Sequence, residues 1–357
     1  MMSKRLGAST PRRGLAPSMR RTLRLRLIAA AALLAGALIL RPLSAPGIEL
    51  AALPNLPASA CQGGDISVLT YNVAGLPWPL AKKGAEALHA IGERLAWMHA
   101  RGCAPSVVVL QEAFSRQAKA IAGLSGYRFV VEGPNRRSGA WPNGVERSWT
   151  LGETEGTPVD SGLMVLSDLP VLNVKKAAFP EGACAGYDCL AAKGVVLVTL
   201  ELPGGRKVLV SDTHFNSKGE SYASAERTID AYRREAYFLA RFVAANRPAG
   251  APVIMAGDFN QGQRAARIAV LQSALDGLAG HSPVDALRAC AGADPQLLAR
   301  SADARWITWR ARDLQFVLNG KAGSLTPMGA EVPFGTERDG SMLSDHMGYT
   351  IRYRYSA

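Results

Sequence analysis

The chain has 357 residues, of which 48% are hydrophobic and 20% are charged, so it can bury a large core. This composition excludes an intrinsically disordered protein, and ordinary glycine and proline contents without a fixed-period repeat exclude collagen-like and solenoid folds. Five cysteines are too few for a small disulfide-rich scaffold. The formal net charge of +12 would suit a nucleic-acid-binding protein if it were spread over the folded domain.

The positive charge is concentrated at the amino end. Residues 1–41 contain nine of the 41 lysines and arginines, and the first acidic residue of the chain is Glu49. The remaining 32 basic residues against 29 acidic residues leave residues 42–357 with a net charge of +3. The body of the protein is therefore close to neutral, which removes the main compositional argument for a nucleic-acid partner.

A run of 14 uncharged apolar residues, 27–40, follows the basic leader. A bilayer span needs about 20 residues, and a positive leader before a shorter apolar run is typical of a secretory signal peptide. We therefore expect an exported protein, secreted or periplasmic, with membrane anchoring through residues 27–40 as the alternative. Residues 1–60 are assigned to the leader, the signal or anchor segment and a spacer, and residues 61–357 to one folded domain, expected to be monomeric.

An exported location permits disulfide bonds. Cys184 and Cys189 flank a glycine-containing turn, which predicts a local bridge. Cys61 and Cys103 each precede a predicted strand, and parallel neighbouring strands would bring the two strand starts together. A Cys61–Cys103 bridge is the second predicted pair, with Cys290 left free, and five reduced cysteines are the alternative.

Short aliphatic or β-branched runs alternate with longer amphipathic stretches from residue 65 onward. Predicted strands cover residues 66–71, 107–110, 127–131, 162–166, 194–201, 207–213, 252–256, 313–318 and 349–355. Predicted helices cover residues 82–101, 115–124, 221–246 and 263–273. Helices between strands, together with some hairpin-length turns, predict an α/β fold with a mixed sheet covered by helices.

Two segments rich in glycine, proline and polar residues interrupt this pattern, at 132–160 and 321–344. We expect both to be irregular and to rim a functional site. Trp78, Trp141 and Trp149 lie on or near this rim, and we expect them to be packed. Three histidines have no carboxylate-rich neighbours in sequence and are expected to be structural: His89, His99 and His281.

Several predicted strands end in the same way, with an apolar run followed by a carboxylate, amide or imidazole. These residues are Asn72, Glu112, Asp212, His214, Asp258 and Asn260, and Asp345 and His346 precede the last strand. Any one of them could merely satisfy a turn or favour a helix start. Their recurrence instead predicts a site, because ligands bind at the carboxyl ends of strands in open α/β sheets.

The residue types of this set indicate a specific chemistry. Oxygen donors without thiolates suit a hard divalent cation such as Mg²⁺. A histidine held by a carboxylate can take a proton from water, and a second imidazole can stabilise developing charge or protonate a leaving group. A metal together with a water-activating base is typical of phosphate ester hydrolysis.

Seven short motifs occur in the order found in the endonuclease/exonuclease/phosphatase superfamily, which the chain resembles from about residue 65 to its carboxyl end. They are Thr70-Tyr71-Asn72-Val73, Leu110-Gln111-Glu112, Ser161-Gly162-Leu163, Asp212-Thr213-His214, Gly257-Asp258-Phe259-Asn260, Arg312-Asp313-Leu314 and Ser344-Asp345-His346. The resemblance implies a deoxyribonuclease-like four-layer α/β sandwich, with two mixed β-sheets packed face to face and flanked by helices.

The resemblance also implies a role for each matched residue. Mg²⁺, with Mn²⁺ or Ca²⁺ as alternatives, would be bound by Glu112, with Asn72 beside it and Asp345 in support. His346 would be the general base for the attacking water, and Asp313 would orient it. Asp258 would position the water, Asn260 would hold a phosphate oxygen, and His214 would assist the transition state or the leaving group.

Departures from other branches narrow the substrate class. Ala74 stands where abasic-site endonucleases carry an acid, and Phe259-Asn260-Gln261 does not fit the signature of inositol-polyphosphate phosphatases. Residues 184–194 are similar to a stretch of neutral and bacterial sphingomyelinases, in which Lys193 would reach a phosphate; a plain turn before a strand is the alternative reading. We expect an exported phosphodiesterase of the sphingomyelinase or phospholipase C type, with a lipid headgroup favoured over nucleic acid. A secreted endonuclease and a non-catalytic binding protein are the alternatives.

Overall fold

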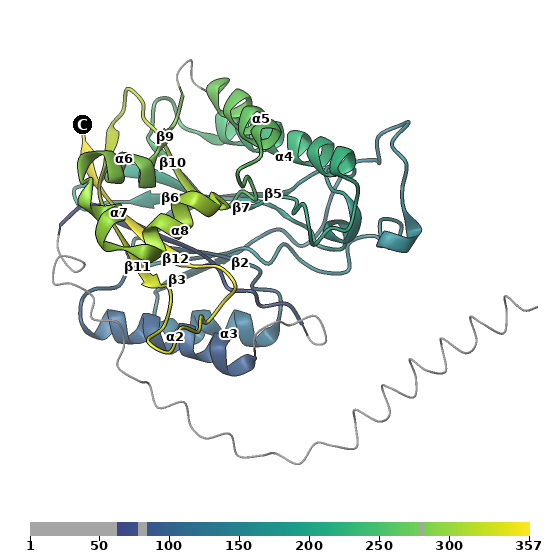
Figure 1. Cartoon of the computed structure of the whole chain (residues 1–357). Coiled ribbons are helices and arrows are strands. Elements are labelled where there is room, and N and C mark those ends of the chain that lie inside the picture. The colour runs from purple at the N-terminus through teal and green to yellow at the C-terminus, as the bar shows by residue number, and fades with distance from the viewer. Residues whose placement is uncertain (1–62, 78–83, 279–281) are drawn as a thin grey trace, which may run out of the picture. The chain divides into compact units, whose positions relative to one another are not determined.

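Two six-stranded β-sheets pack face to face in the computed structural model, which describes residues 63–77, 84–278 and 282–357, and helices cover their outer faces (Figure 1). The strand order is β11-β12-β1-β2-β4-β3 in the first sheet and β5-β6-β7-β8-β10-β9 in the second. Both sheets contain parallel and antiparallel pairs. The predicted four-layer α/β sandwich is confirmed.

The first sheet is built from both ends of the folded domain. Its strands are β1 (Ile66–Asn72), β2 (Val107–Gln111), β3 (Phe129–Glu132), β4 (Met164–Ser167), β11 (Ser324–Phe334) and β12 (Gly348–Ser356). β1 pairs in parallel with β2 and antiparallel with β12. The second sheet is contributed by the middle of the chain and consists of β5 (Val171–Ala178), β6 (Gly194–Glu201), β7 (Lys207–His214), β8 (Val253–Asp258), β9 (Val284–Asp285) and β10 (Asp313–Leu318).

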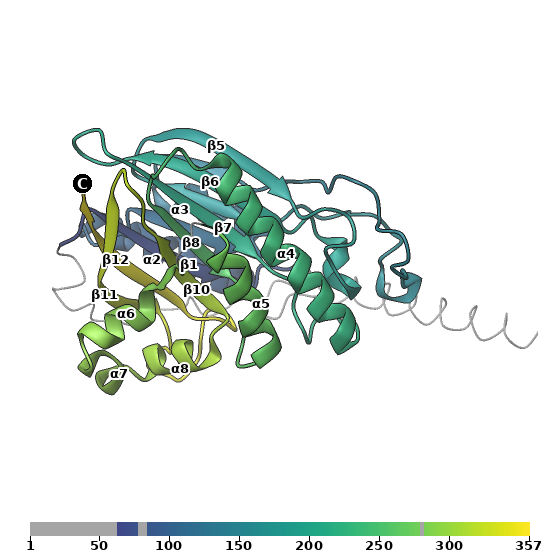
Figure 2. The same cartoon turned by 90° about the horizontal axis from the view of Figure 1, so that it is seen from above.

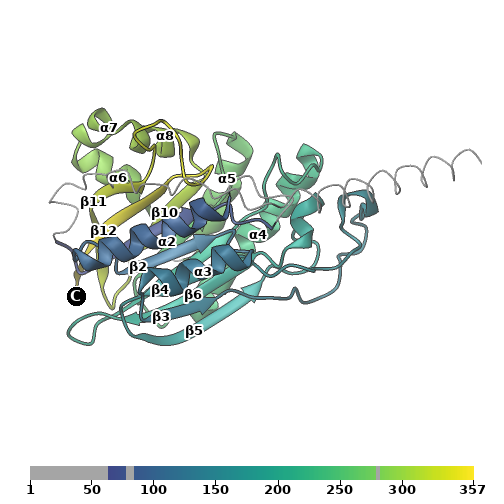
Figure 3. The same ribbon diagram turned by 90° about the horizontal axis from the view of Figure 1, so that it is seen from below.

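Four longer helices cover the sheets. Figure 3 shows α2 (Ala85–Ala100) and α3 (Arg116–Ser125) over the outer face of the first sheet, and Figure 2 shows α4 (Ala225–Asn246) and α5 (Ala265–Asp276) over that of the second. Ser115 and Ser224 cap α3 and α4 by accepting a backbone N–H in the first turn. Short helices complete the fold: α6 (Ala286–Ala293), α7 (Gln296–Arg300), α8 (Ala302–Arg310), η2 (Trp149–Leu151) and η3 (Gly186–Leu190).

The apolar side chains form three buried clusters that match these layers. The cluster between the sheets combines residues of both, for example Val68 and Val109 with Val198 and Ile254. A second lies between the second sheet and α4, and a third lies between the first sheet and α2. Burial of both faces of each sheet explains why the central strands read as continuous apolar runs in the sequence.

The prediction that residues 321–344 are irregular is wrong for about half of that segment. Residues 324–334 form β11, an edge strand that pairs antiparallel with β12. Its register shifts between Pro327 and Gly329 and again between Glu331 and Phe334. Proline and glycine weakened the strand pattern in the sequence, yet both are tolerated at an edge strand with bulges.

The cysteines agree with the predicted pairing where the structure describes them. Cys184 and Cys189 form a disulfide, and Cys290 is free and buried. Cys103 is also disulfide-bonded, and its predicted partner Cys61 lies outside the described residues. Residues 27–40, the predicted signal or anchor, lie outside them as well, and within the described part no helix is long and apolar enough to cross a membrane.

Candidate active site

Three of the predicted site residues come together through the register of neighbouring strands in the second sheet. His214 at the end of β7 lies opposite Asp258 at the end of β8. Asp258 in turn lies opposite Asp313, the first residue of the antiparallel strand β10. The three side chains therefore form a row across one end of the sheet, and all three residues are buried.

Gly257 allows this row to form. Its φ of +142° is a conformation that side chains rarely adopt, and a Cβ there would lie 2.1 Å from the carbonyl oxygen of Thr213. Only glycine therefore lets β8 approach β7 closely enough at this point. The close approach sets Asp258 beside His214.

The first sheet contributes Asn72 and Glu112 from the ends of two parallel strands. Nδ2 of Asn72 donates hydrogen bonds to Oε1 of Glu112 (3.0 Å) and to Oδ2 of Asp258 (3.1 Å), so it links the two sheets. Its Oδ1 accepts the N–H of Ala74 at 3.0 Å. Glu112 has a φ of +57°, a left-handed conformation that costs free energy and that clusters at functional sites.

His346 and Asp313 form a buried pair. Nδ1 of His346 lies 2.9 and 2.8 Å from the two carboxylate oxygens of Asp313, and Nε2 lies 3.8 Å from Oδ2 of Asp258. Burial alone would lower the pKa of His346, but Asp313 and Asp258 raise it to about 9. The pair fixes the orientation of the ring and turns Nε2 toward Asp258.

Asp258 occupies the centre of the site. Its Oδ1 accepts the N–H of Asn260 at 2.9 Å, and its Oδ2 lies 3.6 Å from Nε2 of His214. Burial would raise the pKa of Asp258, but the charge of His346 and the hydrogen bonds from Asn260 and Asn72 lower it to about 2. Asp258 is therefore an ionised carboxylate between two imidazoles.

Lys193 points into the site as a buried cation. Its Nζ lies 2.6 Å from Oδ1 of Asp188 and 3.1 Å from Nε2 of His214. Burial favours the neutral amine, yet Asp188 raises the pKa of Lys193 above its ordinary value. Because an ammonium can only donate, Nε2 of His214 must be the acceptor in this contact. Burial and the charge of Lys193 lower the pKa of His214 well below its usual range, so this imidazole is neutral.

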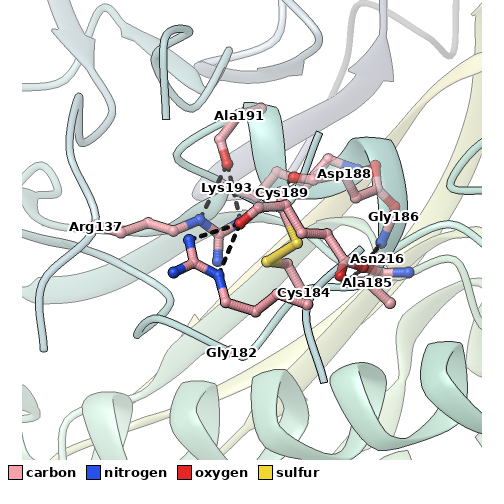
Figure 4. The surroundings of a disulfide bond; sticks show 12 residues. Arg137, Gly182, Cys184, Ala185, Gly186, Asp188, Cys189, Ala191, Lys193 and Asn216 are labelled. Atoms are coloured by element: carbon pink, nitrogen blue, oxygen red, sulfur yellow. Dashed lines mark hydrogen bonds and ion pairs between the residues drawn. A yellow bond between two sulfur atoms is a disulfide. The ribbon is translucent and has the colours of Figure 1, made fainter. Parts of the chain in front are cut away.

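The segment that carries Asp188 is tied down on several sides (Figure 4). Cys184 and Cys189 close a short loop around it, and Arg137 donates two hydrogen bonds to the carbonyl of Ala191. Asn216 accepts the N–H of Ala185 at 2.8 Å. Asp188, and through it Lys193, is held in place by this frame.

Asn260 and Asp345 take less central positions. Asn260 is buried with a φ of +47°, and its Nδ2 donates to the carbonyl of Phe215 at 2.9 Å, so one amide proton remains for another acceptor. Asp345 is partly buried directly before His346, and Arg310 donates to its backbone carbonyl. Asp212, also part of the strand-end pattern, instead accepts a hydrogen bond from Gln111 at 2.7 Å. The structure brings the remaining predicted residues into direct contact with one another: Asn72, Glu112, Lys193, His214, Asp258, Asp313 and His346.

Two parts of the site could hold a cation. Asp258, Asp313 and His346 offer ligand atoms within 4.8 Å of one another, but the contact between His346 and Asp313 already uses Nδ1 and both carboxylate oxygens of that pair. Glu112 has the most exposed side chain among Glu112, Asp258 and Asp313, at 17%, and burial raises its pKa. A nearby cation would favour its ionised form, and carboxylate oxygens suit hard divalent ions.

Asp188 has no role among the residues predicted from the sequence, although it lies in the segment similar to sphingomyelinases. The four residues between Asp188 and Lys193 are the sequence feature that could have indicated their contact. The expectation that Trp149 is packed is wrong, because it is the first residue of η2 and is 75% exposed. His99 is structural as expected, with ring nitrogens 2.7 Å from the Ser125 carbonyl and from Asp168. Trp78 and His281 lie outside the described residues.

Comparisons with known proteins identify the family of the chain. The model of the Endonuclease/Exonuclease/phosphatase family matches residues 69–317. A sphingomyelinase of Mycobacterium bovis is 28% identical over 309 residues, which cover 82% of this chain and 54% of that protein. The chain thus spans about half the length of the curated relatives it matches.

Solved structures show the same fold at low sequence identity. The beta toxin of Staphylococcus aureus with bound magnesium ions superposes with a TM-score of 0.55 at 18% identity, covering 81% of this chain and 99% of that chain. Sphingomyelinase C of Streptomyces griseocarneus gives a TM-score of 0.51 at 22% identity, with the same coverage of 81% and 99%.

Proposed function

The chain belongs to the endonuclease/exonuclease/phosphatase family of phosphoric ester hydrolases, and we propose that it is an exported, Mg²⁺-dependent phosphodiesterase of the sphingomyelinase or phospholipase C type. One observation supports the proposal most directly. The His346–Asp313 pair, Asp258 and the Asn72–Glu112 pair converge at one end of the sandwich, with Lys193 beside His214. This set supplies a base, a site for a cation and a positive charge for a phosphate.

His346 is the proposed general base. Asp313 binds Nδ1, so Nε2 is the nitrogen that accepts a proton from water. Asp258 lies 3.8 Å from that nitrogen and is ionised, so it can accept a hydrogen bond from the same water and orient it. As the new P–O bond forms and the bond to the leaving alkoxide breaks, this proton moves to His346, where both carboxylates stabilise the imidazolium. The departing alkoxide takes a proton from solvent water, and His346 later releases its own proton to solvent.

Lys193 and His214 are proposed to face the non-bridging oxygens of the phosphate. The Lys193 ammonium offers positive charge where negative charge increases in the transition state. His214 offers little charge because it is neutral, and its contact with Lys193 places the ammonium. Asn260 adds a neutral donor through its remaining amide proton.

Glu112 is the proposed cation ligand, with Asn72 holding its carboxylate in position. The oxygen donors of this pair fit Mg²⁺, and Mn²⁺ or Ca²⁺ would find the same donors. When bound, the cation polarises the phosphate and lowers the pKa of nearby imidazoles through its charge. The Staphylococcus aureus beta toxin, a structure of the same fold with bound magnesium ions, supports this choice.

A lipid headgroup is the proposed substrate class. The near-neutral body provides no broad cationic surface for a polyanion. The curated relatives that the chain matches are sphingomyelinases, and the predicted signal peptide would bring the enzyme to lipid outside the cell. A monomer with optional anchoring through residues 27–40 would suffice for this activity.

The test is a substrate panel on the purified chain with and without Mg²⁺: sphingomyelin, single- and double-stranded DNA, and bis-nitrophenyl phosphate. We expect phosphocholine release from sphingomyelin that EDTA abolishes. His346→Ala should remove it, whereas His89→Ala, at an exposed histidine on α2, should not. Absence of phosphocholine release by the wild-type protein refutes the lipid assignment.

A secreted endonuclease is the second candidate, because the same groups would cleave any accessible phosphodiester. It predicts metal-dependent plasmid nicking that disappears in Glu112→Ala and His346→Ala. A non-catalytic binding protein would hydrolyse none of the four substrates.

A further inference from the structure

Exposed tryptophan and tyrosine side chains gather around the proposed active site. Among the described residues six of them are exposed: Trp149 (75%), Tyr222 (73%), Trp309 (61%), Tyr187 (44%), Trp306 (43%) and Tyr237 (38%). Trp309 precedes Arg310, which binds the backbone of Asp345, and Tyr187 precedes Asp188. Tyr222 and the Trp149 segment contact Tyr187 in turn. Exposed large aromatic residues are costly to leave in water, and a cluster of them marks an interaction surface.

The first group lies on α8. Trp306 and Trp309 are one turn apart, and their ring centroids are 4.9 Å from each other. The backbone carbonyl of Trp309 accepts a hydrogen bond from Gln263, three residues after Asn260. The next residue, Arg310, donates to the carbonyl of Asp345, beside His346. The indole pair therefore borders the site next to the proposed base.

The second group lies on the loops that hold Lys193. Tyr187 precedes Asp188 on η3, and its ring packs edge-on against Tyr222 with centroids 5.6 Å apart. The backbone of Tyr187 also donates to the carbonyl of Ser221 at 3.0 Å. Tyr222 has a φ of +57°, so a largely exposed ring is held in an unfavourable backbone conformation.

Trp149 joins this second group from η2. The hydroxyl of Tyr187 reaches the carbonyl of Thr150, the residue after Trp149. Glu153 binds the two loops together, because its carboxylate accepts the N–H of Ser148 and the N–H of Gly186. Trp149, Tyr187 and Tyr222 are thus presented by one connected framework.

We infer that these five residues, Trp149, Tyr187, Tyr222, Trp306 and Trp309, dock the active-site end of the protein onto the surface of a phospholipid bilayer. Trp and Tyr are the side chains that prefer the membrane–water interface, because each has an apolar ring and a polar group. Arg305, exposed beside Trp306, offers a positive charge to lipid phosphates. The inference rests on the proposed function, since an enzyme that cleaves a lipid headgroup must bring its site to that surface.

A single-stranded nucleic acid is the alternative partner for this surface, because its bases also stack on exposed aromatic rings. The two partners differ in what they require around the rings. A strand of nucleic acid needs a positively charged groove as well, whereas residues 42–357 have a net charge of only +3. Binding to a bilayer depends mainly on exposed aromatic side chains that can enter the membrane–water interface, and this end of the protein provides them.

The experiment uses the full chain and two double variants, Trp306→Ala/Trp309→Ala and Trp149→Ala/Tyr222→Ala, with Tyr237→Ala as the control at an exposed aromatic outside the set. Flotation with vesicles of phosphatidylcholine and sphingomyelin measures lipid binding, and filter binding of a single-stranded oligonucleotide measures DNA binding. Quenching of tryptophan fluorescence by brominated phosphatidylcholine reports whether the indoles reach the bilayer. Hydrolysis of bis-nitrophenyl phosphate measures the site without a membrane.

Each double variant should bind vesicles and cleave vesicle sphingomyelin about tenfold less well, with unchanged hydrolysis of bis-nitrophenyl phosphate. Tyr237→Ala should behave as the wild type, and brominated lipid should quench the wild type more than the α8 variant. Equal vesicle binding and equal quenching in all variants overturn the inference, as does loss of single-stranded DNA binding with vesicle binding intact. If the wild type binds vesicles through these residues but cleaves no lipid, the proposed function fails and the docking surface stands.

Discussion

His346 and Asp313 join the two β-sheets through a buried contact between an imidazole nitrogen and both oxygens of a carboxylate, at 2.9 and 2.8 Å. Asp313 begins β10 of the second sheet, and His346 lies two residues before β12 of the first. The proposed base therefore depends on the packing of one sheet against the other.

Asp313→Asn tests this dependence. The amide cannot stabilise the imidazolium, so the rate should fall by about 10²- to 10⁴-fold. Asp313 raises the pKa of His346, so its loss lowers that pKa, and the rising limb of the pH–rate profile should move to lower pH. The profile is measured with bis-nitrophenyl phosphate at fixed Mg²⁺. Asp339→Asn, at an exposed aspartate, is the control. If the rising limb of the Asp313→Asn profile stays where it is in the wild type, the proposed pairing of His346 with Asp313 is contradicted.

Glu112→Gln tests the cation site. The variant keeps the shape of the side chain but removes the charge, so the Mg²⁺ concentration for half-maximal activity should rise at least about tenfold. The measurement is activity against Mg²⁺ concentration, together with calorimetric titration of Mn²⁺ into both proteins. Glu155→Gln at an exposed position should match the wild type. An unchanged metal dependence would place the cation elsewhere.

The Cys184–Cys189 disulfide should support activity as well as stability. Closing such a short loop contributes about 2 kcal/mol to the free energy of unfolding in the chain-entropy model. The double variant Cys184→Ser/Cys189→Ser should therefore melt at a lower temperature. It should also lose activity under conditions where it is fully folded, because the bridge frames Asp188 and through it Lys193. Thermal denaturation and hydrolysis measured on the same preparation check both, and full activity of the folded variant refutes the positioning role.

Glu235 should make the protein less stable as the pH rises. Burial raises the pKa of this α4 carboxyl from its ordinary value of 4.5 to about 8, partly offset by the N–H of Asn216. Below about pH 4.5 both folded and unfolded states are protonated. Between pH 4.5 and 8 only the unfolded state releases the proton, so the free energy of unfolding falls by up to ~1.4 kcal/mol per pH unit.

The matching variant is Glu235→Gln, which has no proton to release. As the pH rises from 5 to 8, the melting temperature of the variant should increase relative to that of the wild type. Glu226→Gln, an exposed position in the first turn of the same helix, should show no such trend. If the melting temperatures of Glu235→Gln and the wild type change by the same amount between pH 5 and pH 8, the raised pKa of Glu235 is contradicted.

Much of the fold could be predicted because the central strands have both faces buried. β6 and β10 were predicted with their observed bounds, since an uninterrupted apolar run leaves little choice. β5 was not predicted because it is an edge strand with mostly exposed side chains and no alternation. The helices α6, α7 and α8 have eight, five and nine residues, too few for a helical period to stand out.

The site could be predicted where polar residues end buried strands, as His214 and Asp258 do. Contacts between loops could not be predicted from the sequence. Asp188 approaches Lys193 because a disulfide, Arg137 and Asn216 fold its loop over β6, and no periodic pattern encodes that arrangement. The exposed pair Trp306 and Trp309 was missed with the short helix that carries it.

The assembly of the first sheet from both ends of the domain has a consequence for synthesis. A growing chain that has reached Leu318 already contains Glu112, Asp258 and Asp313 but lacks the base and the two strands that flank β1 on one side. Catalytic power therefore appears only after nearly all of the domain has emerged from the ribosome. An enzyme proposed to attack phospholipids would remain harmless to the membrane of the producing cell for as long as its chain is incomplete.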